Sequence, residues 1–572
     1  MNRFAPSVFL RRLGSRWDVL AFIVVIGMIV FLGETSRGLF APLTQLQKVP
    51  LSLDPVHLPE YAARTTFRMF AALCVSLLFT LTYATWAAKS ERAGKLLVPL
   101  LDILQSVPIL GFISITVVFF MSLAPGRVLG AEFAAIFAIF TSQAWNMAFS
   151  FYQSLRTIPV ELVEAAESFR LSPWMKFWQL EVPFSMPALI WNMMMSMSGG
   201  WFFVVASEAI SVGHTTVALP GVGSYIALAI AGKDVGAIGW AIATMLIVIL
   251  LYDQLVFRPL VAWVDRFRVE QEPGLRVPQS WALTMMQRSR VVQATTVAFH
   301  AAVLWTSRAV KRSDTPQPEA APVKRRSFDL LWVSLIVLAL VASLWHIFVV
   351  LIRQTPLAEA LQVFGLALLT MVRVFVLIAM ASIIWVPIGV WVGMRPSAAQ
   401  LVQPIAQFMA AFPANLLFPL AVYGIVAFKL NPDIFLSPLM ILGTQWYILF
   451  NVIAGASMIP SEMRYAAANF RVTGWLWWRK VGLPAVLPFY VTGAITASGG
   501  SWNASIVSEV ASWGDDKLSA HGLGAYIAHA TDAGDFPRIV LGVVVMSAYV
   551  LLFNRAFWRP LYTMATRRTT LA

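Results

Sequence analysis

The chain has a single cysteine, Cys74, among its 572 residues. An internal disulfide and an internal cysteine-ligated metal site are therefore excluded. The sequence also lacks the phosphate-binding pattern G-x-x-x-x-G-K-[ST]. Its two glycine-rich stretches, Gly221-Val222-Gly223 and Ser198-Gly199-Gly200, have no following Lys-Ser/Thr. No arrangement of nucleophile and base is evident, and the histidines show no metal-ligand spacing. We therefore expect no enzyme activity and no cofactor bound by this chain.

Charged residues are scarce as well. They make up 12% of the chain, whereas hydrophobic residues make up 59%, far from the composition of a soluble domain. Residues 235–252 and 440–460 carry no charge at all, and about 20 such residues suffice to cross a bilayer as a helix. The net charge of +14 does not indicate nucleic-acid binding. Lys and Arg gather at the ends of the apolar runs, which is typical of positive-inside topology and of contact with membrane lipid.

These runs predict an all-α integral membrane protein with six spans in each half and with both termini in the cytoplasm. A basic leader precedes the first span without a cleavage site, so we expect a retained anchor rather than a signal peptide. Pro108, Pro387 and Pro413 predict kinks or broken helices. The predicted spans lie near residues 19–33, 66–88, 98–123, 131–152, 188–212, 235–257, 329–352, 366–394, 401–428, 436–456, 485–512 and 537–557.

The two halves are repeats of each other. From Trp145/Trp446 to Pro259/Pro560 they align at a constant offset of 301 residues, and Arg68/Arg373 and Pro108/Pro413 align at an offset of 305. An even number of spans in each repeat makes the repeats parallel, so we expect a pseudo-two-fold axis along the membrane normal.

The repeats also predict the domain organisation. Within the linker, Val291–Trp305 is too short to span a bilayer. It is either a basic interfacial helix or a helix packed on the bundle ends. The expected segments are 1–65 (leader, first span and outer segment), 66–262 (domain 1), 263–327 (basic cytoplasmic linker), 328–365 (first span of the second half), 366–562 (domain 2) and 563–572 (cytoplasmic tail).

One polar stretch between spans occurs in both repeats, at residues 158–183 and 459–484. Each copy predicts two short helices joined by a turn. Pro159 suits a first helical turn, and Ser172 and Thr473 are candidate N-caps of the second helix. Small and apolar residues recur at helical spacing and predict a shallow face beside one aromatic side chain, suited to a groove on another protein. In the first copy these are Leu162, Ala165, Ala166 and Phe169, and in the second Met463, Ala466, Ala467 and Phe470.

With Glu164-Ala165-Ala166 and the closing prolines Pro183 and Pro484, these stretches resemble the cytoplasmic coupling loops of binding-protein-dependent ABC importer permeases, most closely the nitrate/sulfonate/bicarbonate group. In two respects they depart from that family. Arg170 and Arg471 stand where glycine is usual, so we expect a turn that is built differently, and Tyr465 replaces the glutamate. The resemblance assigns ATPase coupling to Glu161, Glu164, Ala165, Ala166, Phe169, Arg170, Glu462, Tyr465, Ala466, Ala467, Phe470 and Arg471.

The resemblance implies two tandem six-helix type I permease domains in a bacterial cytoplasmic (inner) membrane. It also implies two ABC ATPase subunits that bind ATP and Mg, a periplasmic or extracellular solute-binding protein, and a small anion such as nitrate, a sulfonate or bicarbonate as substrate. No nucleic-acid partner is expected. The competing interpretations are a secondary transporter that uses Glu208 and Glu509 as proton sites, and a membrane scaffold without solute flux.

Three matched pairs of residues within spans are candidates for the solute pathway: Arg68/Arg373, Trp201/Trp502 and Glu208/Glu509. Carboxylates within a membrane are usually functional or paired, so Glu208 and Glu509 line a path or its outer gate, or else form structural hydrogen bonds to a neighbouring helix or to the loops at Gly221 and Gly522. The two arginines either face a cavity or extend to the outer headgroups, and the second arrangement is favoured.

Overall fold

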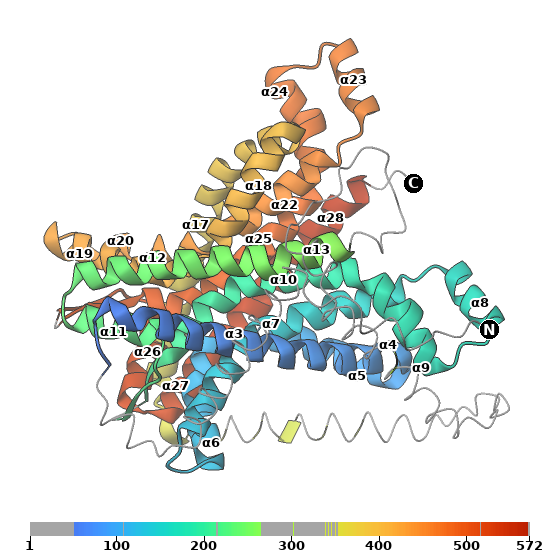
Figure 1. Ribbon diagram of the computed structural model, residues 1–572. Helices are drawn as coiled ribbons and strands as arrows, with labels where there is room; N and C mark the ends of the chain where they lie inside the picture. Colours follow the sequence, from blue (N-terminus) through green and yellow to red (C-terminus); the bar gives the residue numbers. More distant parts are fainter. Residues whose placement is uncertain are drawn as a thin grey trace, which may run out of the picture. The chain divides into compact units, whose positions relative to one another are not determined.

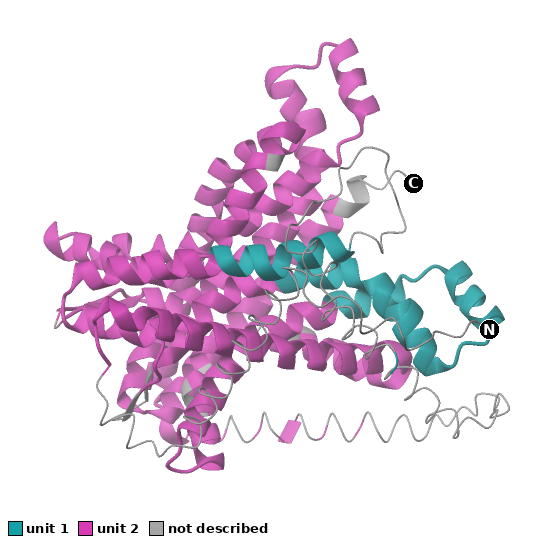
Figure 2. Cartoon of the chain, viewed as in Figure 1, with its two compact units in different colours: residues 1–41, 150–194, 250–326 teal, residues 42–149, 195–249, 327–572 magenta. Residues whose placement is uncertain are grey.

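The computed structural model describes residues 51–106, 108–212, 215–264, 353–514 and 516–569, together with isolated helical positions between 301 and 349. The chain divides into two compact units (Figure 2). Unit 1 contains residues 1–41, 150–194 and 250–326, and unit 2 contains residues 42–149, 195–249 and 327–572. The two units do not coincide with the two sequence repeats.

The described residues are almost entirely helical, and nine of the twelve predicted spans correspond to membrane-length helices or bent helix pairs among them. Seven continuous helices are long and apolar enough to cross a membrane, and two bent helix pairs raise the number to nine. The seven correspond to the predicted spans 66–88, 131–152, 188–212, 235–257, 366–394, 485–512 and 537–557. The predicted span 19–33, nearly all of 329–352 and the stretch 291–305, apart from one helical position, lie outside the described residues.

Two spans at equivalent positions in the repeats are broken at proline, as predicted. In the first repeat α5 (Glu91–Ser106) ends before Pro108 and α6 (Ile109–Leu123) begins after it. In the second, α18 (Pro396–Ala411) and the helix that follows Pro413 meet at 75°. Proline removes a helical hydrogen bond and clashes with the preceding turn. By contrast, α17 (Leu357–Gly393) continues through Pro387, so no break occurs there.

From the short helices α8 and α23 onward, the elements follow one another in the same order in both repeats (Figure 1). The first repeat contains η2 (Pro55–His57), α3 (Leu58–Phe79), η3 (Thr80–Ala84), α4 (Thr85–Lys89), α5, α6, α7 (Val128–Arg156), α8 (Val160–Ser168), α9 (Pro173–Lys176), η4 (Phe177–Glu181), α10 (Val182–Glu208), α11 (Val222–Ala231), α12 (Val235–Tyr252), η5 (Asp253–Phe257) and α13 (Arg258–Val264). The second contains α17, α18, η7 (Ala414–Leu417), α19 (Phe418–Ala427), α20 (Pro432–Phe435), α21 (Leu439–Leu442), α22 (Gln445–Ser457), α23 (Ser461–Asn469), α24 (Gly474–Trp477), η8 (Trp478–Gly482), α25 (Leu483–Ser508), α26 (Leu523–Ala533), α27 (Phe536–Phe553), η9 (Asn554–Trp558) and α28 (Arg559–Thr569).

Two small antiparallel hairpins are the exception to the helical fold. Strands β1 (Ala209–Val212) and β2 (Thr215–Ala218) pair with Ala209 opposite Ala218, and β3 (Val510–Trp513) and β4 (Asp516–Ser519) pair with Val510 opposite Ser519. The sequence analysis did not predict them. Each hairpin directly follows the long fifth helix of its repeat, α10 or α25, where the sequence analysis extended the span to residue 212 or 512.

In unit 2 the core is formed by α17, α22 and α25, whose backbones approach closely at glycine. A Cβ at Gly389 would lie 2.7 Å from Val452, and one at Gly493 would lie 2.6 Å from the Tyr447 carbonyl oxygen. Small residues permit such contacts between membrane helices. Close approach also occurs at Gly200 and Gly500, whereas Gly199 makes an ordinary contact and Gly499 faces open space.

Substitution of two glycines of α25 tests this packing. Gly493→Ala would force its methyl group against the backbone of α22, and such overpacking costs about 1–3 kcal/mol. Gly499→Ala is the matched control in the same helix. Its Cβ meets nothing within 4 Å, and alanine favours a helix by about 1 kcal/mol over glycine. We expect a lower thermal midpoint for Gly493→Ala only, measured on purified protein in detergent. Equal midpoints would contradict the close approach.

Candidate functional site

The two predicted coupling helices are present as α8 and α23. Pro159 and Pro460 stand at the N-cap, one residue before each helix begins. Each helix has one buried residue, Ala166 in α8 and Ala467 in α23. Phe169 and Phe470 are 80% and 81% exposed, so each helix presents an aromatic side chain to its surroundings. The exposed surface also includes the predicted coupling residues Glu161, Glu164, Ala165, Arg170, Glu462, Tyr465, Ala466 and Arg471.

Both helices end in a turn that normally favours glycine. The Leu171 N–H donates to the Ala166 carbonyl at 3.1 Å, and the Arg170 N–H donates to the Glu167 carbonyl at 2.8 Å. This pair of bonds is a Schellman motif. Arg170 and Arg471 hold its left-handed position with φ of 50° and 51°. The left-handed turn therefore forms with arginine at the place where the resembled family has glycine.

The second short helix of each coupling segment begins differently in the two repeats. In the first, the Ser172 hydroxyl accepts a hydrogen bond from the Met175 N–H at 3.3 Å, which confirms the predicted N-cap. In the second, the Thr473 side chain makes no capping bond, so that prediction is wrong. There Gly474 takes the place of Pro173 and adopts a φ of 56°.

A buried ion network joins three helices of the first repeat. The Arg68 guanidinium of α3 donates two hydrogen bonds of 2.6 Å to the Glu132 carboxylate of α7. It donates a third, of 2.8 Å, to Glu208 at the end of α10. All three side chains are nearly inaccessible to solvent. Because charges in a low-dielectric environment must be paired, these contacts fix the three helices relative to one another.

The Glu208 carboxylate also holds the turn that follows the β1–β2 hairpin. Its Oε2 accepts from the Gly223 N–H at 2.7 Å, and its Oε1 accepts from the Thr65 hydroxyl at 2.7 Å. A Cβ at Gly221 would overlap this carboxylate. Glycine is therefore required there by close approach, and the turn at residues 220–223 closes directly over Glu208.

The second repeat contains an equivalent but more open network. Glu509 accepts from the Thr370 hydroxyl at 2.9 Å and from Arg373 at 3.4 Å, and Gly522 lies against it as Gly221 lies against Glu208. Asp433 occupies the position of Glu132 and receives one Arg373 bond of 3.0 Å instead of two. Its side chain is 35% exposed.

His521 adds a partner that the first network lacks. It stands at the position of Pro220, its backbone N–H donates to Asp433 at 2.7 Å, and its ring Nδ1 lies 3.0 Å from the same carboxylate. The His521 side chain is 79% exposed. The second network is therefore accessible from outside the bundle, whereas the first is closed.

In each repeat, the structure thus brings the predicted arginine into contact with the predicted glutamate. Arg68 contacts Glu208, Arg373 contacts Glu509, and the carboxylates bond to the loops at Gly221 and Gly522, as the structural alternative proposed. The favoured extension of the arginines to headgroups is wrong, because both guanidiniums are held by carboxylates. Trp201 and Trp502 are each 1% exposed. Whether any of these six residues takes part in solute passage stays a prediction.

Sequence reasoning missed Glu132 as the main partner of Arg68. The available signal was the match between Glu132 and Asp433 at the same offset of 301 residues. Two acidic residues repeated at this offset indicate a shared role in the two halves.

The repeats also touch each other through the second hairpin. The Gly514 N–H, between β3 and β4, donates to the Ile230 carbonyl of α11 at 3.0 Å. Lys233, which follows α11, forms an ion pair of 3.2 Å with Asp516. All four residues lie in unit 2, so the hairpin of one repeat is anchored on the other repeat.

Comparison with known proteins places these features in a family. Residues 64–267 and 385–557 each match the family described as "Binding-protein-dependent transport system inner membrane component". Similar proteins include the bicarbonate transport system permease protein CmpB of Synechococcus elongatus, 30% identical over 177 residues, which are 31% of this chain and 60% of the relative. The nitrate import permease protein NrtB of Leptolyngbya laminosa is 26% identical over 182 residues, 32% of this chain and 62% of the relative.

A third relative is the glycine betaine/carnitine transport permease protein GbuB of Listeria monocytogenes. It is 27% identical over 182 residues, which are 32% of this chain and 59% of the relative. The chain thus spans less than two thirds of the length of each of these three relatives. The two family matches occur in tandem and together cover more than half of the chain.

The buried networks differ enough for their loss to have unequal effects. Glu208→Gln would place an amide N–H₂ against a donor in either orientation and would leave Arg68 short of one charge. Breaking a buried pair costs about 3–5 kcal/mol. Glu509→Gln should cost less, because its arginine contact is longer and Arg373 is more exposed. We expect the larger drop in thermal midpoint for Glu208→Gln. Equal drops, or a larger drop for Glu509→Gln, would contradict the conclusion that the first network is more buried and more tightly bonded than the second.

The left-handed arginines yield a second stability prediction. In the left-handed conformation, a residue with a side chain is less stable than glycine by roughly 1–2 kcal/mol. Substitution by glycine recovers only part of this free energy, because glycine makes the unfolded chain more flexible. Arg471→Gly should therefore slow amide hydrogen exchange in residues 464–472 about two- to fivefold. Arg464→Gly is the matched control, since glycine inside α23 costs about 1 kcal/mol and should speed that exchange. Faster exchange in both variants would contradict the assigned turn.

Proposed function

Because the chain belongs to the family of binding-protein-dependent transport system inner membrane components, we propose that it is the membrane-embedded permease of an ATP-driven importer. The observation that carries the proposal is the repeated coupling segment. One exposed short helix with an exposed phenylalanine stands between the fourth and fifth spans of each repeat. Two equivalent attachment points in one chain suit two ATPase subunits.

In this proposal the chain transmits force and performs no chemistry. Closure of the ATPase subunits around ATP and Mg would draw α8 and α23 together. Each coupling segment continues through a π-helical turn, η4 or η8, into the long fifth helix of its repeat. A movement of the short helices would therefore reach α10 and α25 and open the solute path to one side and then the other. The coupling segments and both termini would lie in the cytoplasm, and an external solute-binding protein would deliver the solute.

We assign a small anion as the substrate, of the size of nitrate, a sulfonate or bicarbonate. Support comes from the relatives named for bicarbonate and nitrate. The relative named for glycine betaine makes a zwitterion the competing outcome. Arg68 and Arg373 do not decide between them, because carboxylates already neutralise both.

The geometry does not favour a transporter driven by proton binding at Glu208 and Glu509. Both oxygens of Glu208 already accept hydrogen bonds from N–H, O–H or guanidinium donors. The side chain is also fully buried, whereas a coupling proton must exchange with water on each side in turn.

Co-purification and transport test the function directly. A tagged chain should bring down an ABC ATPase from its native membrane. The purified complex in proteoliposomes should take up solute with ATP inside the vesicles and with a protonophore present. Uptake that stops with the protonophore while ATP persists would instead support the ion-driven alternative, and an absence of flux for every anion and zwitterion would support the scaffold.

The two coupling segments differ in charge, which predicts unequal docking. Residues 156–181 carry three bases and four acids, and residues 457–484 carry four bases and one acid. We expect Glu164→Arg to lower ATP-driven uptake about tenfold, because it reverses a charge on the exposed surface of α8. Tyr465→Ala, at the matching position of α23, should lower uptake less than threefold. Equal losses in the same proteoliposome assay would refute the inequality.

A further inference from the structure

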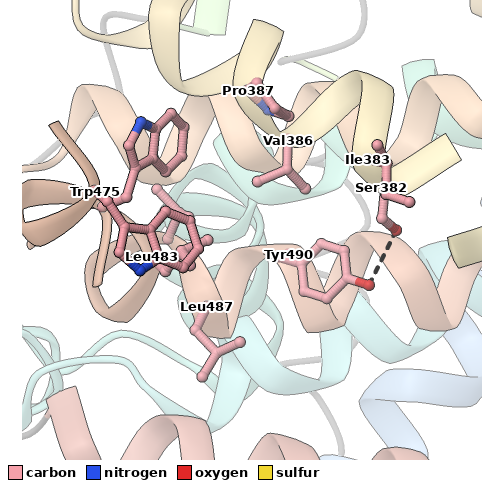
Figure 3. A pocket seen from close by; sticks show the side chains of 10 residues that line it. Ser382, Ile383, Val386, Pro387, Trp475, Leu483, Leu487 and Tyr490 are labelled. Atoms are coloured by element: carbon pink, nitrogen blue, oxygen red, sulfur yellow. Dashed lines mark hydrogen bonds between the residues drawn. The ribbon is translucent and has the colours of Figure 1, made fainter. Parts of the chain in front are cut away.

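An apolar cavity adjoins the second coupling segment. It has a volume of about 570 Å³ and lies in unit 2 between α17 and the first two turns of α25 (Figure 3). Trp475 of α24 and Trp478 of η8 line one part of it. Pro387, on the α17 side, is six residues from the end of that helix. The cavity therefore lies at the end of the bundle that carries α23 and α24 (Figure 1).

The chemistry of the cavity excludes a small hydrophilic solute. Ser382 and Tyr490 contribute hydroxyl oxygens that are bonded to each other at 3.0 Å (Figure 3), and aliphatic and aromatic side chains form the remainder of the lining. Pockets of roughly 300–1,000 Å³ accommodate small organic ligands, and an apolar lining of this kind favours hydrocarbon. Ile383 and Trp475 are each 75% exposed, so the cavity opens sideways, onto the surface that a bilayer would cover.

Positive charges stand at the same end of the bundle. Arg479 and Lys480 directly follow Trp478 in η8, and Arg395 lies two residues beyond the end of α17. All three are exposed. Within the described part of the chain, the structure gives Arg479 and Lys480 no ion pair. Cationic side chains beside an apolar recess complement an anionic lipid, whose phosphate lies at the interface while its acyl chains lie in the hydrocarbon.

We infer that this cavity holds an acyl chain of one anionic phospholipid, with the lipid phosphate at Arg479 and Lys480. The inference rests on the proposed function only for placing this end of the bundle at the cytoplasmic leaflet. The bound chain packs against Trp475 and Trp478, which belong to the second coupling segment. A bound lipid chain therefore fills the space between α17 and the segment formed by α24 and η8. This segment connects the coupling helix α23 to the long helix α25.

The first repeat lacks the residues that make this site. At equivalent positions Leu77 and Leu189 replace Ser382 and Tyr490, and Trp178 and Gln179 replace the two cations. One such lipid is therefore expected for each chain, at the second repeat alone.

The number of retained lipids tests the site. The complete complex is reconstituted in vesicles of phosphatidylcholine with one quarter phosphatidylglycerol, extracted, and examined by native mass spectrometry. We expect one retained phosphatidylglycerol that is lost at least fivefold in Arg479→Gln/Lys480→Gln and in Leu487→Trp, which fills the cavity. The control Arg464→Gln/Arg471→Gln removes equal charge from α23 and its C-terminal turn and should retain the lipid. Equal retention in all variants, or equal retention of phosphatidylcholine, would overturn the inference.

A second measurement does not depend on the variants folding. Phosphatidylglycerol with a photoreactive acyl chain should label peptides 475–490 and 382–387 of the unmodified complex. Labelling confined to other surfaces would overturn the inference, whether lipid binds elsewhere or a protein segment such as residues 331–352 covers the cavity. Neither readout needs ATP or solute, so failure of the lipid site and failure of the transport function are distinguished.

Discussion

A carboxylate buried at the end of the fifth helix, Glu208 or Glu509, determines how the surrounding helices and the following turn pack in each repeat. In the first repeat Glu208 accepts hydrogen bonds from the Thr65 and Arg68 side chains of α3 and from the Gly223 N–H of the following turn. An ionised group in such surroundings is tolerated only when its oxygens are fully bonded. The same requirement explains why glycine occupies position 221, why an arginine lies within an apolar helix, and why the hairpin folds back over the helix end.

The two repeats differ in how completely this network is buried and bonded. Glu132 grips Arg68 with both oxygens inside the bundle, while Asp433, shorter by one methylene, makes one bond to Arg373 and shares its oxygens with His521. In the proposed permease, the two coupling segments on the cytoplasmic side also differ from each other. The second coupling segment carries more positive charge and adjoins an apolar cavity. The pseudo-symmetry of the sequence thus covers two halves with distinct physical properties.

The sequence predicted features that depend on local pattern: the spans from apolar length, the breaks from Pro108 and Pro413, and the short helices from their spacing. It did not predict features decided by contacts distant in the chain. Glu132 meets Arg68 across 64 residues, and no local signal separates such an acid from one at a membrane surface. The first strand of each hairpin was predicted as helix because its residues continue an apolar run. The left-handed arginines were missed because arginine carries no preference for that conformation.

The presence of both repeats in one polypeptide has a genetic consequence. In a transporter assembled from two copies of one gene product, any codon change alters both sides of the assembly at once. Here the exchange of proline for histidine between positions 220 and 521 is expressed on one side only. A substitution in one repeat of a single chain therefore leaves the matching residue of the other repeat unchanged.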